Sequence, residues 1–234
     1  MFITFEGGEG TGKSTQVKML AARLVAQGHQ VIVTREPGGT PQGEKVRNLL
    51  VSGDPETWLP DEETLLNFAA RSAHLRNVIR PALSQGKIVV CDRFIDSTAA
   101  YQVYAGNRSS LDFFKFLVEQ IVGDTLPKIT FVLDIDPAVG VMRSRNRMAG
   151  QKIISEEIAN DFMSTGSQES LSAAIQIAGS ANEDRFERKS IEFHKLVREG
   201  FRIIAREDSN RCRLIDASQS IEVVADQIWA QVYG

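Results

Sequence analysis

A glycine-rich stretch near the N-terminus constrains the fold of this 234-residue chain more than any other feature. It runs from Gly7 to Ser14, reads G-x-x-x-x-G-K-S, and lies between an apolar run at Phe2–Phe5 and a segment of helical spacing at Thr15–Leu24. Glycines let successive backbone N–H groups turn toward an anion, and the new helix presents the positive end of its dipole, so the pattern predicts a phosphate-binding P-loop. The predicted phosphate-binding residues are Gly7, Gly8, Glu9, Gly10, Thr11, Gly12, Lys13, Ser14 and Thr15.

Composition narrows the class of protein. The length suits one α/β domain over 1–234, and the net charge of −3 argues against nucleic-acid binding by bulk electrostatics. We find no apolar run long enough to span a bilayer and no signal-peptide pattern, so we expect a cytoplasmic protein without a membrane partner. Cys91 and Cys212 both lie in predicted strands, which favours two buried thiols over a disulfide.

Apolar strands and helical segments alternate along the chain. Strands are expected at Phe2–Phe5, His29–Thr34, Lys87–Cys91, Ile129–Leu133 and Arg213–Ile215. Helices are expected at Thr15–Leu24, Glu44–Leu50, Asp61–Leu83, Leu111–Val122, Ala138–Met148, Arg185–Arg206 and Ile221–Val232. Within the long Asp61–Leu83 segment, Pro81 predicts a kink or an early end, and the expected inward positions are Leu65, Leu66, Ala69, Leu75, Val78 and Ile79. The alternation predicts a five-stranded parallel sheet with helices on both faces and ligands at the carboxyl ends of its strands.

Two charged residues, Asp92 and Arg93, follow directly after a predicted strand, at the edge of the sheet where ligands are expected. Asp92 closes an apolar strand, which is the Walker-B arrangement for holding Mg²⁺, although a helix N-cap is the alternative interpretation. Arg93 suits a bidentate phosphate contact, and a surface ion pair is its alternative.

Arg143, Arg145 and Arg147 are spaced by two, so they do not share a helix face. On spacing alone a solvated basic face is the better interpretation of these three arginines.

Together, four segments resemble thymidylate kinases of the bacterial type. They are the P-loop with Glu9, Thr34–Thr40, Asp92–Gln102 and Asp184–Glu187, and the resemblance covers 1–147 and roughly 184–232. It implies the P-loop NTPase fold of nucleoside-monophosphate kinases and transfer of the γ-phosphoryl group of ATP to dTMP, with Mg²⁺ bound by Ser14 and Asp92. It also implies a homodimer formed through the helices of the Asp61–Leu83 and Leu111–Val122 regions.

The resemblance assigns roles to particular residues. It places Glu9 beside the nucleotide sugar, Arg93 on the monophosphate and Tyr101 against the deoxyribose, where a 2′-hydroxyl would crowd. Ser97 and Gln102 address the base. Arg71 and Arg47 match arginines that hydrogen-bond the thymine and order its pocket. The full set that it implies for dTMP is Glu9, Glu36, Pro37, Arg47, Asn67, Arg71, Arg93, Ser97, Tyr101 and Gln102.

The resemblance also reverses the interpretation of the basic segment, which is the stretch that holds Arg143, Arg145 and Arg147. One branch of the family carries a catalytic arginine in the P-loop, and here that position is Gly10. The chain therefore resembles the other branch, in which a lid supplies the arginine. Arg147 becomes the leading catalytic arginine, Arg143 and Arg145 assist, and Lys13 and Arg93 complete the catalytic set.

The chain departs from the family pattern in two places. Family members carry an aromatic ring, stacked on the thymine, four residues before the base-binding arginine, and here that position is Asn67. The next residue, Phe68, lies about 100° further around a helix, so we expect it to point into the core. The segment Met148–Glu183 is much longer than the family's lid and rich in small and polar residues, and its role is unassigned.

Three other functions remain open at this stage. A kinase for another nucleoside or nucleotide would follow if Asn67 reshapes the base pocket. A slowly hydrolysing P-loop switch protein is a second candidate, although the N-K-x-D motif of GTP switches does not occur in the sequence. An inactive relative with an altered lid is the third. His29, His74 and His194 show no metal-binding spacing and are expected on the surface, while Trp58 and Trp229 are expected to pack.

Overall fold

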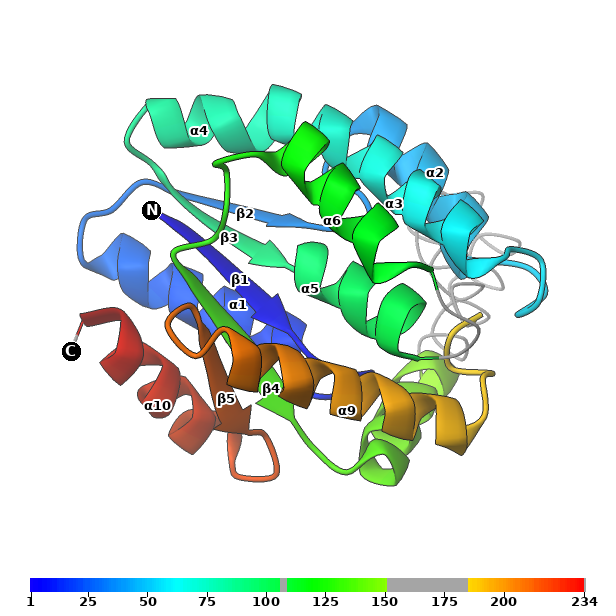
Figure 1. Cartoon of the computed structure of the whole chain (residues 1–234). Coiled ribbons are helices and arrows are strands. Elements are labelled where there is room, and N and C mark those ends of the chain that lie inside the picture. The colour runs from blue at the N-terminus through cyan, green and yellow to red at the C-terminus, as the bar shows by residue number, and fades with distance from the viewer. Residues whose placement is uncertain (106–108, 151–184, 234) are drawn as a thin grey trace, which may run out of the picture.

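The computed structural model describes residues 1–105, 109–150 and 185–233, and its centre is a five-stranded sheet (Figure 1). The strands are β1 (Phe2–Glu6), β2 (Val31–Arg35), β3 (Ile88–Asp92), β4 (Ile129–Asp134) and β5 (Cys212–Asp216). They lie in the order β2-β3-β1-β4-β5, and every neighbouring pair is parallel. The predicted parallel sheet is therefore confirmed. Because β1 is central and β3 is its neighbour, the loop after β1 and the Asp92 end of β3 meet at one edge of the sheet.

Helices cover both faces of this sheet (Figure 1). The α-helices are α1 (Lys13–Ala26), α2 (Pro41–Val51), α3 (Pro60–His74), α4 (Arg80–Ser84), α5 (Ile95–Thr98), α6 (Leu111–Leu117), α9 (Ile191–Glu207) and α10 (Ile221–Tyr233). Three π-helical stretches, η1 (Leu75–Ile79), η2 (Ala99–Tyr104) and η3 (Val118–Val122), continue α3, α5 and α6. Residues 137–150 are also helical. None of the helices in the described part of the chain is long and apolar enough to cross a membrane.

Each face of the sheet has its own hydrophobic core. Ile3 and Phe5 of β1 pack with Leu20 of α1 and Ile228 of α10 on one face. Phe2 packs on the other face with residues of α3, η2, α6 and α9. Successive side chains of a strand point to opposite faces, so strands covered on both sides need continuous apolar sequence, and that is what the predicted strands show. Cys91 and Cys212 are free, buried thiols, as the sequence predicts.

The long helical segment before β3 buries a different face from the one that the sequence predicts. It runs as α3, η1 and α4, and the wider π-helical turn ends just before Pro81, where the proline ring would clash with the carbonyl of an earlier turn. Leu65 and Ala69 are exposed, whereas Leu75 and Ile79 are buried as predicted. The inward face of α3 carries polar residues instead, since Thr64, Arg71 and His74 are each at most 1% exposed.

The helix expected at Arg185–Arg206 begins later in the structure than the sequence predicts. The helix α9 begins at Ile191, where the hydroxyl of Ser190 accepts a hydrogen bond from the Phe193 N–H, and residues 185–190 form turns. Arg185 is fully buried and donates to three backbone carbonyls of the 50–55 segment, and it pairs with Glu63 of α3 at 2.6 Å. A side chain committed to these contacts holds its backbone out of the helix. Residues 148–150 of the expected lid are helical, and the rest of it lies outside the described residues.

Candidate active site

The P-loop closes around its own lysine. Gly10 and Gly12 have φ angles of 64° and 92°, which side chains other than glycine rarely adopt. The Nζ of Lys13 donates to the carbonyls of Gly7 at 3.1 Å and Gly8 at 2.7 Å. Burial, and then the nearby Arg93, lowers the pKa of Lys13 to about 8. The ammonium group therefore lies inside the loop, next to the backbone N–H groups that would receive a phosphate.

The helical residues 137–150 dock against the P-loop through two glycines. A Cβ atom built on Gly10 would overlap the carbonyl of Gly140, and one built on Gly140 would overlap the carbonyl of Glu9. A side chain at Gly10 would thus collide with this helix. The contact places Arg147, seven residues after Gly140, at the wall of the cavity that holds Lys13 and Asp92.

Ser14 and Asp92 meet at the carboxyl ends of β1 and β3. The hydroxyl of Ser14 donates to Oδ2 of Asp92 at 2.7 Å, although the two residues are 78 positions apart. A hydroxyl and a carboxylate are oxygen ligands of the kind that Mg²⁺ prefers, with water and substrate phosphates as the remaining ligands. Within the described ranges there is no cluster of three or more His, Cys, Asp or Glu residues that would hold a metal ion by itself. The pair therefore fits Mg²⁺ bound together with a nucleotide.

Arg93 is the centre of the site's hydrogen bonds. Its φ of 70° is in the left-handed region, which costs a non-glycine residue about 1–3 kcal/mol. Its guanidinium donates to Glu9 at 2.9 Å, to the Tyr101 hydroxyl at 3.2 Å and to Ser97 Oγ at 3.0 Å, besides the Gly7 carbonyl at 2.9 Å. These contacts offset the strain and aim the side chain at the P-loop. It is a half-buried network rather than a surface ion pair.

Two carboxylates on the P-loop side have pKa values displaced in opposite directions. Burial would raise the pKa of Glu9, but Arg93 and Lys13 outweigh it and lower the value to about 2. Burial, and then the charge of Asp96, raises the pKa of Glu6 to about 7. Glu6 is fully buried at the end of β1 and accepts hydrogen bonds from the Phe94 N–H at 2.7 Å and the Ser97 hydroxyl at 2.5 Å. It thus supports the Arg93–Ser97 turn from behind.

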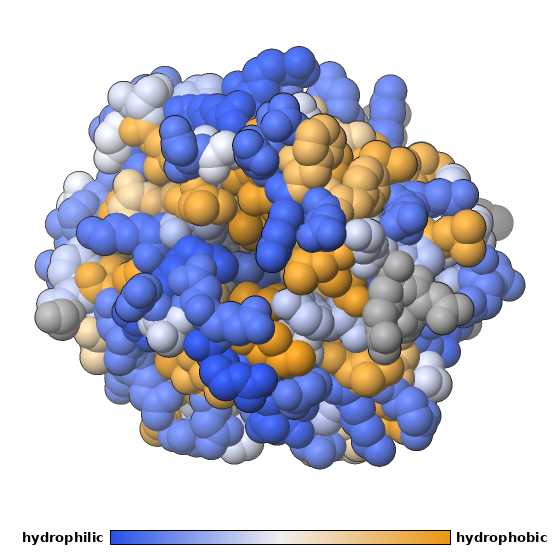
Figure 2. Space-filling model, in the orientation of Figure 1, coloured by the Kyte–Doolittle hydropathy of each residue, from blue (hydrophilic) through white to orange (hydrophobic). Residues whose placement is uncertain are grey.

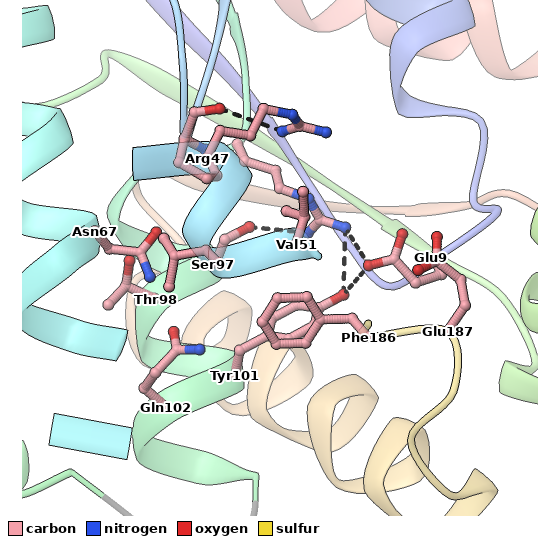
Figure 3. Close-up of a pocket in the computed structure, with 13 residues that line it drawn as sticks. Glu9, Arg47, Val51, Asn67, Ser97, Thr98, Tyr101, Gln102, Phe186 and Glu187 are labelled. Atoms are coloured by element: carbon pink, nitrogen blue, oxygen red, sulfur yellow. Dashed lines mark hydrogen bonds and ion pairs between the residues drawn. The ribbon is translucent and has the colours of Figure 1, made fainter. Parts of the chain in front are cut away.

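Two cavities adjoin at this network. The smaller, of about 110 Å³, extends away from Glu9 toward Asn67, Thr98 and Gln102 (Figure 3). The larger, of about 850 Å³, contains the P-loop, Asp92 and Arg147. Both are lined by Glu9, Arg47, Arg93 and Glu187. Ligands in the two cavities would therefore approach each other beside Arg93 and Lys13.

The far end of the smaller cavity is built on α3. Asn67 lines it, while Phe68 is 1% exposed and packs edge-on against Phe114 in the core, as the helical spacing predicts. Gln102 also lines the cavity and donates to Glu63 at 2.8 Å. Arg47 lines it too, and donates to the Pro37 carbonyl at 3.2 Å.

Arg71, which the resemblance assigns to the base, is buried and lines neither of the two cavities directly. It is held on several sides. The guanidinium carbon of Arg71 lies 4.6 Å from the Phe68 ring centre and 5.1 Å from that of Phe94. Arg71 donates to Glu36 at 2.8 Å and to the Thr98 hydroxyl at 3.1 Å. Both groups are buried, so the arginine is fixed before any ligand binds.

The three arginines of the basic segment have different surroundings. Arg147 lines the larger cavity and donates to Ser144 Oγ at 3.1 Å. Arg145 lines a different cavity and donates to the backbone carbonyl of Glu187 at 3.2 Å. Arg143 is exposed and lines none of the cavities described here. Of these three arginines, only Arg147 therefore lies at the cavity that contains the P-loop.

Sequence reasoning missed several residues of the site. Thr98, Phe186 and Glu187 line the smaller cavity, and burial, then the charge of Glu9, raises the pKa of Glu187 to about 7. All three lie in the segments Asp92–Gln102 and Asp184–Glu187, which carry the family resemblance, but the resemblance assigns these three residues no role. The expectation of surface histidines is wrong for two of three: His74 is 0% and His194 4% exposed, and only His29 is on the surface. Their contacts are tertiary, which sequence spacing does not reveal.

This fold and site define a P-loop kinase-type protein, with a phosphate loop after the first strand and a second ligand cavity beside it. A family model described as thymidylate kinase matches residues 5–171. Curated thymidylate kinases from Afipia carboxidovorans and Caulobacter vibrioides are 43% and 42% identical to the chain, covering 97% of it in both cases and 86% and 93% of their own lengths. The crystal structure of thymidylate kinase from Ehrlichia chaffeensis matches with a TM-score of 0.69 and 31% identity, covering 100% of this chain and 98% of that one. The chain belongs to the thymidylate kinase family.

Proposed function

We propose that this protein transfers the γ-phosphoryl group of ATP to dTMP, giving dTDP and ADP. The observation that carries the proposal is the junction of two cavities at Arg93 and the P-loop. A phosphoryl transfer needs donor and acceptor phosphates in line and close together, and it rewards positioning and cationic groups more than covalent chemistry. The family membership gives the substrate class.

The donor occupies the larger cavity. Its phosphates bind the backbone N–H groups of the P-loop and the ammonium group of Lys13, which moves from the Gly7 and Gly8 carbonyls to phosphate oxygens. Ser14 and Asp92 would hold Mg²⁺, which neutralises charge on the β- and γ-phosphates when bound. Arg147 adds a second cation from the opposite wall, where charge spreads over the transferring group in the transition state.

The acceptor occupies the smaller cavity. Arg93 binds the monophosphate, because its guanidinium lies at the end that both cavities share. Tyr101 lies beside the deoxyribose, and its hydroxyl, donating to Glu9 at 2.7 Å, leaves little room for a ribose 2′-hydroxyl. Gln102 and Asn67 line the base end, and Arg71 lies behind it, hydrogen-bonded to the lining residue Thr98. The phosphate of dTMP is itself the nucleophile, so the reaction requires neither a covalent enzyme intermediate nor a strong general base.

An assay of ADP release with ATP and a panel of nucleoside monophosphates tests the proposal. We expect dTMP to be strongly preferred and UMP to be poor, because of the crowding at Tyr101. Equal use of ribo- and deoxyribonucleotides, or a preference for another base, would support a different nucleotide kinase. ADP release without any acceptor would point to a slow NTPase, and its complete absence to an inactive relative.

We further propose that two copies associate through α3 and α6. Leu65 of α3 is 50% exposed and Phe116 of α6 is 55% exposed. Figure 2 shows apolar side chains gathered over α6. Exposed apolar patches of this kind mark contact surfaces. Sedimentation of the wild type and of Phe116→Glu would test this, with a dimer expected only for the wild type. A cytoplasmic location stays a prediction of the sequence.

A further inference from the structure

A chain of four side chains connects the wall of the larger cavity, which Thr34 and Glu36 line, to Arg71, whose partner Thr98 lines the smaller cavity. Oγ1 of Thr34 lies 2.6 Å from Nε2 of His74, and Nδ1 of the same ring lies 2.9 Å from Oε1 of Glu36. The other carboxylate oxygen of Glu36 accepts from Nε of Arg71 at 2.8 Å. All four side chains belong to residues that are buried or, for Thr34, half-buried beneath the loop that follows β2.

Each hydrogen bond in this chain has a defined direction. A carboxylate can only accept, so the proton of His74 is on Nδ1 and points to Glu36. A neutral ring then accepts the Thr34 hydroxyl at Nε2. The two carboxylate oxygens of Glu36 each have a partner, and its side chain is 3% exposed. Glu36 lines the larger cavity, but both of its carboxylate oxygens are used within the protein, so its link to the smaller cavity runs through Arg71 and Thr98.

Arg71 has one nitrogen left over. Its Nε and Nη2 donate to Glu36 and Thr98, and its Nη1 is buried without a hydrogen-bond partner among the described residues. A buried donor without a partner is costly unless a ligand satisfies it. The rings of Phe68 and Phe94 near the guanidinium limit its tilt, and Glu36 fixes its rotation in the plane. The direction of Nη1 is thus set by Glu36.

We propose that His74 is a positioning residue for nucleobase recognition, which fixes Glu36 and, through it, the free donor of Arg71. The inference rests on the proposed function, in which Arg71 addresses the base of dTMP. Without His74, one oxygen of Glu36 would be unsatisfied in a buried site, and the carboxylate would turn toward another donor. Arg71 would then lose the orientation that the bound base requires.

The packing around His74 explains why an imidazole suits this position. A Cβ atom on Gly39 would lie 2.6 Å from both His74 Nε2 and Thr34 Oγ1, so the backbone of the loop after β2 passes directly over the pair. A flat ring fits under this backbone and carries two polar atoms pointing in opposite directions. It thereby joins α3, which carries Arg71, to the loop that carries Glu36.

Substitutions at His74 separate positioning from packing. In His74→Asn the amide nitrogen is as many bonds from Cα as Nδ1 and can still donate to Glu36. In His74→Gln the amide lies near the position of Nε2 and can pair only with Thr34, and His74→Leu removes both contacts. His29→Asn is the matched control, because His29 is exposed and contacts Tyr233 on the far side of α1.

The readouts are the Kd of dTMP by calorimetry and the steady-state constants for both substrates. We expect His74→Gln and His74→Leu to raise the Kd of dTMP about 10- to 100-fold, the range for losing a hydrogen bond to a charged group. The KM of ATP and kcat at saturating dTMP should change less than about twofold. His74→Asn should stay within about threefold of the wild type, as His29→Asn does.

Several results would overturn the positioning role. One is a folded His74→Leu protein with an unchanged Kd of dTMP. Another is a loss of the same size for His74→Asn, or an equal rise in the KM of ATP. If His74→Leu does not fold, His74→Gln and His74→Asn decide: only the glutamine variant should weaken dTMP binding, and Thr34→Val, which leaves the contact between His74 and Glu36 in place, should not. A wild type that does not bind dTMP would refute the proposed function itself, so the two failures are distinguishable.

Discussion

Glu6→Gln is the substitution whose effect on stability the structure predicts most directly. Glu6 is fully buried, and burial, followed by the charge of Asp96, raises its pKa from the ordinary 4.5 to about 7. Between these two values the folded protein binds a proton that the unfolded chain has released. The free energy of unfolding contributed by Glu6 is therefore highest below about pH 4.5 and is lost as the pH rises through 7.

The size of this loss follows from the two pKa values. One pKa unit corresponds to about 1.4 kcal/mol, so the displacement from 4.5 to about 7 amounts to roughly 3 kcal/mol at high pH. Between pH 5 and pH 8 most of it, about 2 to 3 kcal/mol, should be lost. Glutamine has almost the same shape and can still accept from the Phe94 N–H, but it does not titrate. The difference in stability between Glu6→Gln and the wild type should thus grow in favour of the variant by about 2 to 3 kcal/mol over this range.

Urea unfolding of both proteins at pH 5 and pH 8 measures this difference. Groups whose displaced pKa values do not depend on Glu6, such as Glu187, are present in both proteins, so their contributions cancel. Asp112→Asn is the control, because Asp112 is an exposed carboxylate in the first turn of α6. A stability difference between Glu6→Gln and the wild type that does not change with pH would refute the reasoning. It would mean that Glu6 remains ionised throughout, held by Phe94 and Ser97.

Three further substitutions test the catalytic site. Lys13→Ala should abolish phosphoryl transfer in a folded protein, as circular dichroism and the ADP-release assay would show; near-normal turnover would exclude the P-loop role. Arg147→Ala should lower kcat about 10²- to 10³-fold with little change in either KM, whereas Arg143→Ala, on the same helix but outside the larger cavity, should change neither. Asn67→Phe should tighten dTMP binding by about 1 kcal/mol through stacking, without affecting ATP, and calorimetry showing weaker binding would contradict this.

The sequence by itself determined the fold class and the phosphate side of the site. Continuous apolar runs alternating with helical periodicity specify a parallel sheet, because only strands covered on both faces need such runs. The predicted P-loop is equally local, because it depends on glycines and on a helix start that are adjacent in the chain, and Gly7 to Ser14 lie between β1 and the first turn of α1 as the sequence predicts. The position of Phe68 in the core also followed from helical spacing alone.

Only the tertiary structure decided which polar residues are buried and what they contact. The sequence predicts a surface position for His74 and a helical one for Arg185, but they are buried by partners 38 and 135 positions away. The position of Arg147 at the larger cavity likewise depends on how the helix 137–150 meets the P-loop at Gly140. Hydrophobic periodicity shows which side chains of a segment face the apolar core and which face solvent. A buried polar group, by contrast, needs a hydrogen-bond partner, and here a distant segment of the chain supplies it.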